Sequence, residues 1–161
     1  KLYGSLSNCY YAGNIRVSGA VGGLVGNCYS GSVSSEIDHC YMASAQMKTS
    51  DSSASCGALV GTLHTGGKVY CCYSTDVTDN LFGVNNGSDL LCYFSSGEEF
   101  ASGSVCWKLN DSSNDTPVWY QTLGEDLYPV LDATHGVVVY KEDNYKEKYN
   151  VFIVDICICL C

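Results

Sequence analysis

Short apolar runs alternate with turns rich in Gly, Ser and Asn along the first 95 residues of the chain. Val, Ile, Tyr and Thr in the runs favour strands, while Gly, Ser and Asn between them favour turns. No segment has a sustained apolar period of about 3.6 residues, which would indicate an amphipathic helix. The pattern therefore predicts an all-β chain of many short strands.

An apolar triplet that ends in Gly recurs along these residues. It stands as Leu24-Val25-Gly26, Leu59-Val60-Gly61 and, in degenerate form, Leu81-Phe82-Gly83, and the first two copies follow Gly22-Gly23 and Gly57-Ala58. The interval between copies shortens along the chain. Variable intervals indicate insertions at one corner of a repeating unit, and residues 48–55 are the clearest candidate.

A Cys-Tyr pair is the second recurring signature. It begins at Cys9, Cys28, Cys40, Cys72 and Cys92, and an aliphatic residue stands three positions earlier at Leu6, Ile37 and Val69, replaced by Asp89 in the last unit. Residues an odd number apart on a flat strand point to opposite faces. Both can face inward only if the chain bends between them. We expect Cys to fill the interior as a small apolar residue, with Tyr either pointing outward or lying along a stacked aromatic row.

The unit thus consists of a strand, a Gly-rich turn, a second strand and another turn. A period of roughly 20–30 residues is that of a solenoid coil, in which each apolar residue stacks on its equivalents. We predict a β-solenoid of irregular coils over residues 1–95. The residues expected to maintain its repeat are Gly22, Gly23, Leu24, Val25, Gly26, Gly57, Leu59, Val60, Gly61, Cys40, Cys72 and Cys92.

The repeat stops after Ser96. Residues 96–140 contain both Trp, both Pro and a Val-Val-Val run, and we expect them to form a C-terminal β cap over the exposed end of the solenoid. Residues 141–150 are polar and predict a linker or solvated turn. Residues 151–161 are apolar and end in three alternating Cys, and they form either the first strand of a further segment or an unnatural chain end.

The two signatures together resemble the GLUG repeat, named for its Gly-Leu-apolar-Gly core. The resemblance rests on Gly22-Gly23-Leu24-Val25-Gly26 and on the Cys-Tyr-Ser-Gly-Ser-Val run of residues 28–33, and it covers about residues 1–95. GLUG repeats occur in large bacterial surface proteins, including adhesin-like proteins of gut Bacteroidetes and IgA-cleaving peptidases. The resemblance implies an extracellular or cell-surface location and a repeat region without catalysis of its own.

Charge and cysteine content narrow the choice of partners. The formal net charge is −9 and no basic cluster is present, which argues against nucleic acid and anionic membranes as partners. The longest apolar run, residues 151–161, is too short to span a bilayer.

The 11 cysteines are odd in number, and we favour free buried thiols over disulfides between coils. Because the chain starts at Lys1, we expect a fragment or a processed piece.

We find no catalytic motif and expect no cofactor and no metal. Asp38-His39-Cys40 is not expected to converge, because neighbouring strand residues alternate faces. Cys157, Cys159 and Cys161 share one face of a strand but lack the spacing of common zinc sites. Asp76 and Asp79 lack the Gly-Asp repeat of calcium-binding solenoids. Glu98-Glu99 and the acidic residues of 111–115 are interpreted as solvated turns.

The tyrosines are the best candidate for binding. A row of Tyr29, Tyr41, Tyr73 and Tyr93 would form an outward aromatic strip for sugar rings or a partner protein, or else a structural ladder on the flank. We expect an adhesive or structural surface that meets a host or dietary glycan or an extracellular protein. Two alternatives are a carbohydrate-active β-helix protein and a spacer without ligand, the latter favoured if the row is buried.

Overall fold

The computed structural model describes residues 1–29, 34–43, 47–75 and 80–148. Within these residues the chain is mostly strand, with two short helices and a hairpin in its C-terminal third. The described residues between positions 2 and 94 form a stack in which the equivalent strands of successive repeats pair in parallel. The all-β prediction is confirmed, and the parallel sheets fit a β-helix.

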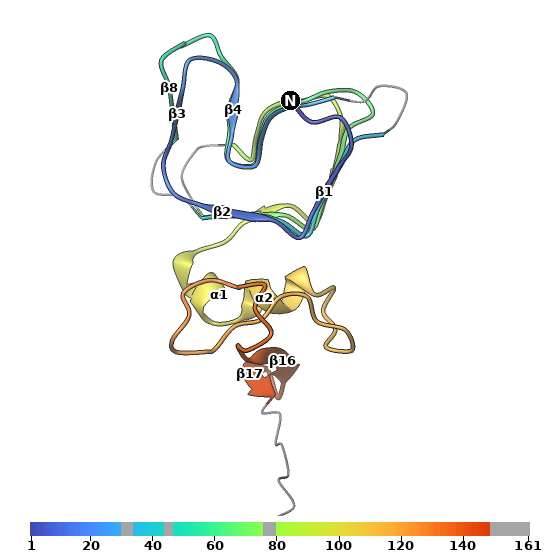
Figure 1. Cartoon of the computed structure of the whole chain (residues 1–161), viewed down its shortest axis with the longest axis vertical. Helices are drawn as coiled ribbons and strands as arrows, with labels where there is room; N and C mark the ends of the chain where they lie inside the picture. Colours follow the sequence, from blue (N-terminus) through green and yellow to red (C-terminus); the bar gives the residue numbers. More distant parts are fainter. Residues whose placement is uncertain (30–33, 44–46, 76–79, 149–161) are drawn as a thin grey trace, which may run out of the picture.

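Three parallel sheets form the walls of this stack (Figure 1). The first sheet contains β1 (Ser5–Ser7), β6 (Glu36–Asp38), β11 (Lys68–Tyr70) and β14 (Ser88–Leu90). The second, which we call the tyrosine sheet, contains β2 (Tyr10–Ala12), β7 (Tyr41–Ala43), β12 (Tyr73–Ser74) and β15 (Tyr93–Phe94). The third contains β5 (Val25–Cys28), β10 (Val60–Leu63) and β13 (Phe82–Asn85).

The strand register matches the repeat alignment read from the sequence. In the third sheet Val60 pairs with Val25 on one side and with Phe82 on the other. In the first sheet Ile37 pairs in the same way with Leu6 and Val69. The two recurring signatures therefore mark equivalent positions of stacked strands.

The predicted bend lies immediately before each Cys of the tyrosine corner. The residue at this place has left-handed backbone in every repeat, with φ of 50° at Asn8, 48° at His39, 49° at Cys71 and 56° at Leu91. One such residue redirects the chain from the first sheet into the tyrosine sheet. As a result Ile37 and Cys40, three residues apart, are both fully buried.

Glycine before the apolar triplet permits a close approach of backbone to backbone. A Cβ at Gly22 would lie 2.2 Å from the carbonyl oxygen of Val25 and 2.5 Å from the amide nitrogen of Gly61. A Cβ at Gly57 would lie 2.2 Å from the carbonyl oxygen of Val60. The obstructing atoms are backbone, so they cannot move aside as a side-chain end would. Gly22 and Gly57 therefore have no side chain because backbone atoms pack directly against both positions.

An apolar core fills the inside of the stack. Its buried members come from all three sheets and from the turns between them: Val21, Val25, Cys28, Ile37, Cys40, Met42, Ala58, Leu59, Val60, Leu63, Val69 and Cys72. Most are aliphatic, and each sits near its equivalent in the next repeat. Predicted repeat residues Leu59, Val60, Cys40 and Cys72 are thus core residues, while Leu24 and Cys92 pack against the core from half-buried positions.

The expected insertion is an arm shared by the first two repeats. β3 (Ile15–Val17) pairs with β8 (Met47–Thr49), and β4 (Val21–Gly22) pairs with β9 (Cys56–Gly57). Residues 48–55 are therefore only the second copy of this arm. The corresponding part of the third repeat includes residues 76–79, which lie outside the described residues.

The C-terminal segment contains helices that the sequence pattern did not predict. α1 (Gly97–Ala101) begins at a capping box, in which Ser96 and Glu99 exchange side-chain-to-backbone hydrogen bonds. α2 (Ser104–Leu109) follows, and β16 (Val137–Lys141) and β17 (Asn144–Lys148) form an antiparallel hairpin. The expectation of a purely β cap is therefore wrong. The boundary at residue 140 is wrong too, because it cuts the hairpin, and residues 141–148 are not a linker.

This segment covers a flank of the stack and leaves its end open. Seen along the stacking direction, α1 and α2 lie beside β2, and the hairpin lies on the far side of these helices (Figure 1). The side chains of the last repeat stay exposed, with Leu90 at 61% and Tyr93 at 51%. The expected cover of the solenoid end is thus replaced by a second apolar contact along the tyrosine sheet.

Residues 149–161 lie outside the described residues, and so do the predictions made for residues 151–161. In the part of the chain that the structure describes, no helix has the length and apolar character needed to cross a membrane.

Candidate functional site at the tyrosine flank

Three of the four predicted tyrosines form one row. Tyr73 pairs in register with Tyr41 and Tyr93, and Tyr10 completes the row beyond Tyr41. Tyr29 belongs to another corner. It stacks between Tyr3, at a ring-centroid distance of 5.3 Å, and His64, at 4.0 Å.

The middle of the tyrosine row is buried beneath the C-terminal segment. Tyr41 is 1% exposed and Tyr73 is 2% exposed. The Tyr41 ring contacts Phe100 and Trp119 at centroid distances of 5.4 and 5.3 Å, and its hydroxyl donates to the carbonyl oxygen of Pro129 at 2.7 Å. Of the two alternatives drawn from the sequence, the burial of these residues disfavours the open aromatic strip and favours the structural ladder, because the rings are covered by an apolar surface.

A second apolar cluster results from this cover. Tyr41, Ala43, Cys71 and Tyr73 of the repeats pack with residues of the C-terminal segment, namely Phe100, Val105, Cys106, Leu109, Trp119 and Val138. The indole nitrogen of Trp119 also donates to the side-chain oxygen of Asn8 at 3.2 Å. The tyrosine row thus serves as the docking surface of the C-terminal segment.

An open crevice remains where the cover ends. Its volume is about 510 Å³, and its wall includes Tyr70, Tyr93, Phe94, Lys108 and Asp111. Tyr93 is half exposed there. Sites for small ligands have volumes of roughly 300–1,000 Å³ and combine apolar walls with a few polar groups. The crevice therefore has the size and lining of a small-ligand site.

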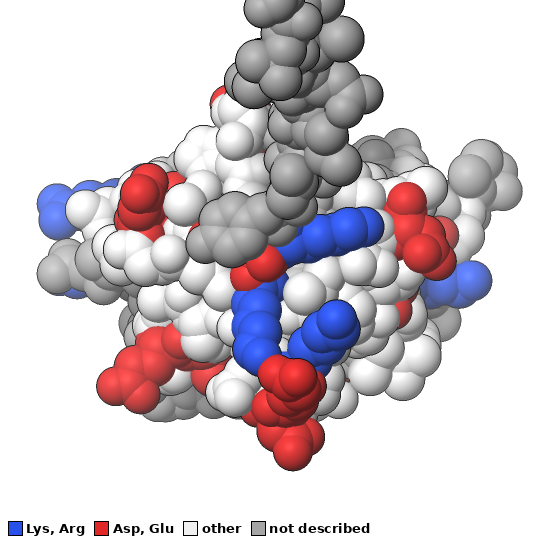
Figure 2. Space-filling model, turned by 90° about the horizontal axis from the view of Figure 1, so that it is seen from below, with Lys and Arg blue, Asp and Glu red and all other residues white. Residues whose placement is uncertain are grey.

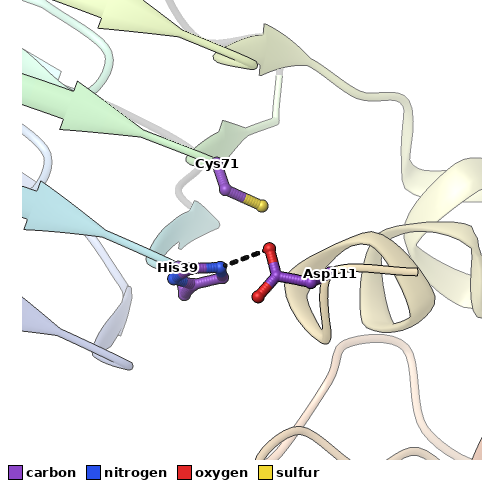
Figure 3. Close-up of side chains that lie close together, drawn as sticks. All are labelled: His39, Cys71 and Asp111. Carbon is purple, nitrogen blue, oxygen red and sulfur yellow. Dashed lines mark hydrogen bonds and ion pairs between the residues drawn. The ribbon is translucent and has the colours of Figure 1, made fainter. Parts of the chain in front are cut away.

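Three side chains with metal-binding or acid–base chemistry meet beside this crevice. His39 and Cys71 occupy the left-handed corners before β7 and β12, and Asp111 lies in the loop after α2. The nearest donor atoms of the three residues lie within 4.8 Å of one another. Figure 3 shows the three side chains pointing toward a common space, with the hydrogen bond between His39 and Asp111 dashed.

The imidazole of His39 lies between two carboxylates. Its Nε2 is 2.9 Å from Oδ1 of Asp111, and its Nδ1 is 3.1 Å from Oδ1 of Asp38. Burial lowers the pKa of His39, but the hydrogen bonds and charges of Asp111 and Asp38 outweigh burial and leave this pKa raised. The two carboxylates therefore favour the protonated, positively charged form of the His39 imidazole, or a cation next to it.

The expectation for Asp38-His39-Cys40 is wrong for its first two members. Asp38 and His39 do touch, because His39 sits at a left-handed corner and not on a flat strand. Cys40 faces the core, and its thiol donates to the main-chain carbonyl oxygen of Asp38 at 3.0 Å. Cys71 is the nearer thiol, but burial raises its pKa to about 12. A thiol with this pKa is protonated at neutral pH and is a poor nucleophile.

The cysteines of the core form a ladder of thiols. Cys9, Cys40, Cys72 and Cys92 occupy the equivalent place in each repeat, and every described cysteine is a free thiol. The pKa of Cys72 is raised by hydrogen bonding with Cys40 and Cys92 and by burial. Hydrogen bonding with Cys72 lowers the pKa of Cys40 and that of Cys92. The ladder is thus a set of hydrogen-bonded thiols that pack with the apolar core.

Of the other groups considered from the sequence, Glu99 lines the crevice. Glu98 and Glu99 lie in the first turn of α1, where Glu99 is engaged in the capping box. Asp76, Asp79, Cys157, Cys159 and Cys161 lie outside the described residues.

Sequence reasoning missed the meeting of His39, Cys71 and Asp111. A partial signal was present, because His39 and Cys71 both directly precede a Cys-Tyr pair and therefore occupy the same corner of adjacent repeats. No pattern linked Asp111 to them, since its position depends on how the C-terminal segment docks.

Charges on the neighbouring face are mixed. Figure 2 looks at the molecule from the side of the hairpin, and basic and acidic side chains lie among one another on that face. The Lys-rich hairpin contributes both signs, with Lys146 paired to Glu142. The described residues of this face thus carry both signs of charge close together.

Comparison with known proteins identifies no relative: no family model matches the chain, and no curated protein and no solved structure is significantly similar to it. The class that the described residues define is an all-β protein with stacked parallel sheets.

Proposed function

We propose that residues 1–95 form a β-solenoid of the GLUG type and that the chain is a non-catalytic structural or adhesive region of a secreted or cell-surface bacterial protein. Parallel pairing of equivalent residues supports the solenoid, as in Leu6–Ile37 and Val60–Phe82. The resemblance of both signatures to GLUG repeats supports the location and the absence of catalysis.

The burial of Tyr41 and Tyr73 is the observation that favours a structural role over an adhesive role for this chain. An adhesive aromatic strip must present its rings to a ligand, but these rings contact the chain's own C-terminal segment. The segment ties neighbouring repeats together along one flank, since it touches β7 and β12 at once. Such a brace stiffens a stack whose repeats otherwise contact only their neighbours. The structural role is therefore the leading one.

A screen of the full chain against mucin glycans, plant polysaccharides and matrix proteins tests this role. Products are analysed for every polysaccharide. The structural role predicts neither saturable binding nor cleavage. Release of shortened products by the purified chain would overturn the non-catalytic assignment.

Saccharide binding in the crevice is the second candidate, favoured by the half-exposed rings of Tyr93 and Phe94 beside Lys108 and Asp111. Aromatic faces with a polar rim suit sugar rings. If the screen finds a saturable glycan, Tyr93→Ala should weaken its binding at least about tenfold, an effect of about 1.4 kcal/mol. The matched control is Tyr3→Ala, an exposed tyrosine at another corner that should leave binding unchanged.

A further inference from the structure

The convergence of a nitrogen, a sulfur and an oxygen donor at the flank has a specific chemical use. We propose that His39, Cys71 and Asp111 bind a divalent transition-metal ion, with Zn²⁺ as the best match, and that this ion fastens the C-terminal segment to the repeats. The sequence by itself led us to expect no metal. The inference does not rest on the proposed function.

The spacing of the donor atoms suits zinc. Zinc–ligand distances of about 2.0–2.3 Å place tetrahedral ligands roughly 3.3–3.8 Å apart. The nearest donors of the three residues already lie within 4.8 Å of one another, and His39 Nε2 is 2.9 Å from Asp111 Oδ1. To share one ion, donors as far apart as 4.8 Å would have to approach by about one ångström, and the His39–Asp111 pair would have to open slightly.

The kinds of donor select the class of ion. Calcium and magnesium prefer sites made wholly of oxygen. Imidazole, thiolate and carboxylate together are ligands of zinc and its neighbours among the transition metals. Because the ligand atoms must be deprotonated, the entering ion would displace the proton of the Cys71 thiol, and any proton on Nε2 of His39, to solvent. Three protein ligands leave a fourth position. Asp111 is exposed, so that position opens toward the crevice and is accessible to water or to a ligand.

Hydrogen bonds with neighbouring groups hold two of the proposed ligands, His39 and Asp111, in place. Asp38 accepts from Nδ1 of His39 at 3.1 Å, which directs Nε2 toward the shared space. A carboxylate on the outer nitrogen is the usual support of a zinc-binding histidine. The hydroxyl of Tyr70 donates to Oδ1 of Asp111 at 3.4 Å, and the backbone amide of Asp111 donates to the carbonyl oxygen of Lys108.

The site joins parts of the fold that lie far apart along the chain. His39 belongs to the second repeat and Cys71 to the third, while Asp111 comes from the loop after α2. An ion held by all three would cross-link two adjacent repeats and their cover. We therefore expect metal to stabilise the folded chain, because an ion that binds only the native state raises its stability.

The test uses the full-length chain with Cys157, Cys159 and Cys161 replaced by Ser, so that the C-terminal thiols cannot bind metal. The protein is freed of metal and titrated with Co²⁺, and then with Zn²⁺ in competition. We expect one ion per chain, a thiolate-to-cobalt charge-transfer band, and a higher unfolding temperature with Zn²⁺. Mg²⁺ should produce no stabilisation.

Matched variants assign the ion to the site. Cys71→Ser should abolish the charge-transfer band, whereas the control Cys56→Ser should retain it. Asp111→Asn should weaken Zn²⁺ binding at least about 100-fold, whereas the control Asp115→Asn should not change it. Asp111 and Asp115 are both exposed in the same loop, so either variant should fold. Asp38→Asn should weaken binding about 10–100-fold, as loss of an outer carboxylate does.

Two results would overturn the proposal. One is the absence of Zn²⁺ binding above the level of a Mg²⁺ control. The other is binding that persists unchanged in both Cys71→Ser and Asp111→Asn, which would place the ion elsewhere. Circular dichroism of each variant without metal ensures that lost binding is not lost folding.

Discussion

Replacing Tyr41 measures how much the buried tyrosine row contributes to the fold. The ring is 1% exposed and lies against Tyr10, Phe100 and Trp119 at centroid distances between 5.2 and 5.4 Å. Truncating a buried aromatic ring to Ala costs about 3–5 kcal/mol in the free energy of unfolding. We therefore expect Tyr41→Ala to lower the unfolding temperature by roughly 6–20 °C, at about 2–4 °C per kcal/mol for a chain of this size.

Tyr41→Phe measures the contribution of the Tyr41 hydroxyl separately from that of the ring. It removes only the hydrogen bond to the carbonyl oxygen of Pro129, which is 2.7 Å long. Because this bond is buried, the change leaves the Pro129 carbonyl oxygen without its partner, and the loss should be about 1–3 kcal/mol. Tyr3→Ala is the matched control, because Tyr3 also stacks on a tyrosine but is largely exposed. Its cost should stay below about 1.5 kcal/mol, the upper value for one aromatic pair.

Urea unfolding, followed by fluorescence and by circular dichroism, gives these free energies. Limited proteolysis adds a local readout, since a weakened flank should expose α2 and the hairpin to cleavage before the stack. If Tyr41→Ala costs no more than Tyr3→Ala, the row is not buried in solution and the structural role of the C-terminal segment fails.

Three further changes probe other parts of the fold. Gly22→Ala should cost about 1–3 kcal/mol in urea unfolding because its Cβ would meet backbone at 2.2 Å, whereas Gly97→Ala, with open space at this position, should be neutral. Ile37→Ala should cost about 2–5 kcal/mol by thermal and urea unfolding, since Ile37 is fully buried in the core. The hydrogen bond with Asp126 raises the pKa of His135, so their pairing stabilises the fold fully below the ordinary His pKa of about 6.5 and loses its effect as pH rises through the raised value. Urea midpoints from pH 5.5 to 8.5 should therefore fall more in the parent than in His135→Gln, and equal slopes would contradict the assignment.

The repeats could be predicted because each unit carries its own local signals. The spacing of three between Ile37 and Cys40 required a bend, and a single left-handed residue supplies it at His39. Register followed from the recurring Leu-Val-Gly and Cys-Tyr signatures, because equivalent residues of a stack must bury equivalent side chains.

The C-terminal segment could be predicted only in part. The capping box of Ser96 and Glu99 was a readable start signal for α1, although the helix is too short to show an apolar period. The turn of the hairpin uses Glu142 and Asp143 at positive φ, where Asn-Gly would have been the strong signal. The burial of Tyr41 and the position of Asp111 beside His39 both depend on how the C-terminal segment packs against the repeats. No local sequence pattern indicates that contact.

The contact between Trp119 and the tyrosine row tests the central claim most directly. Nuclear Overhauser measurements on the full chain would report which protons lie near the Trp119 indole. The structure predicts cross-peaks to the rings of Tyr41 and Tyr10, whose centroids lie 5.3 and 6.1 Å from the Trp119 ring. Cross-peaks from Trp119 to residues of the C-terminal segment alone would contradict a docked flank and return the tyrosine row to solvent.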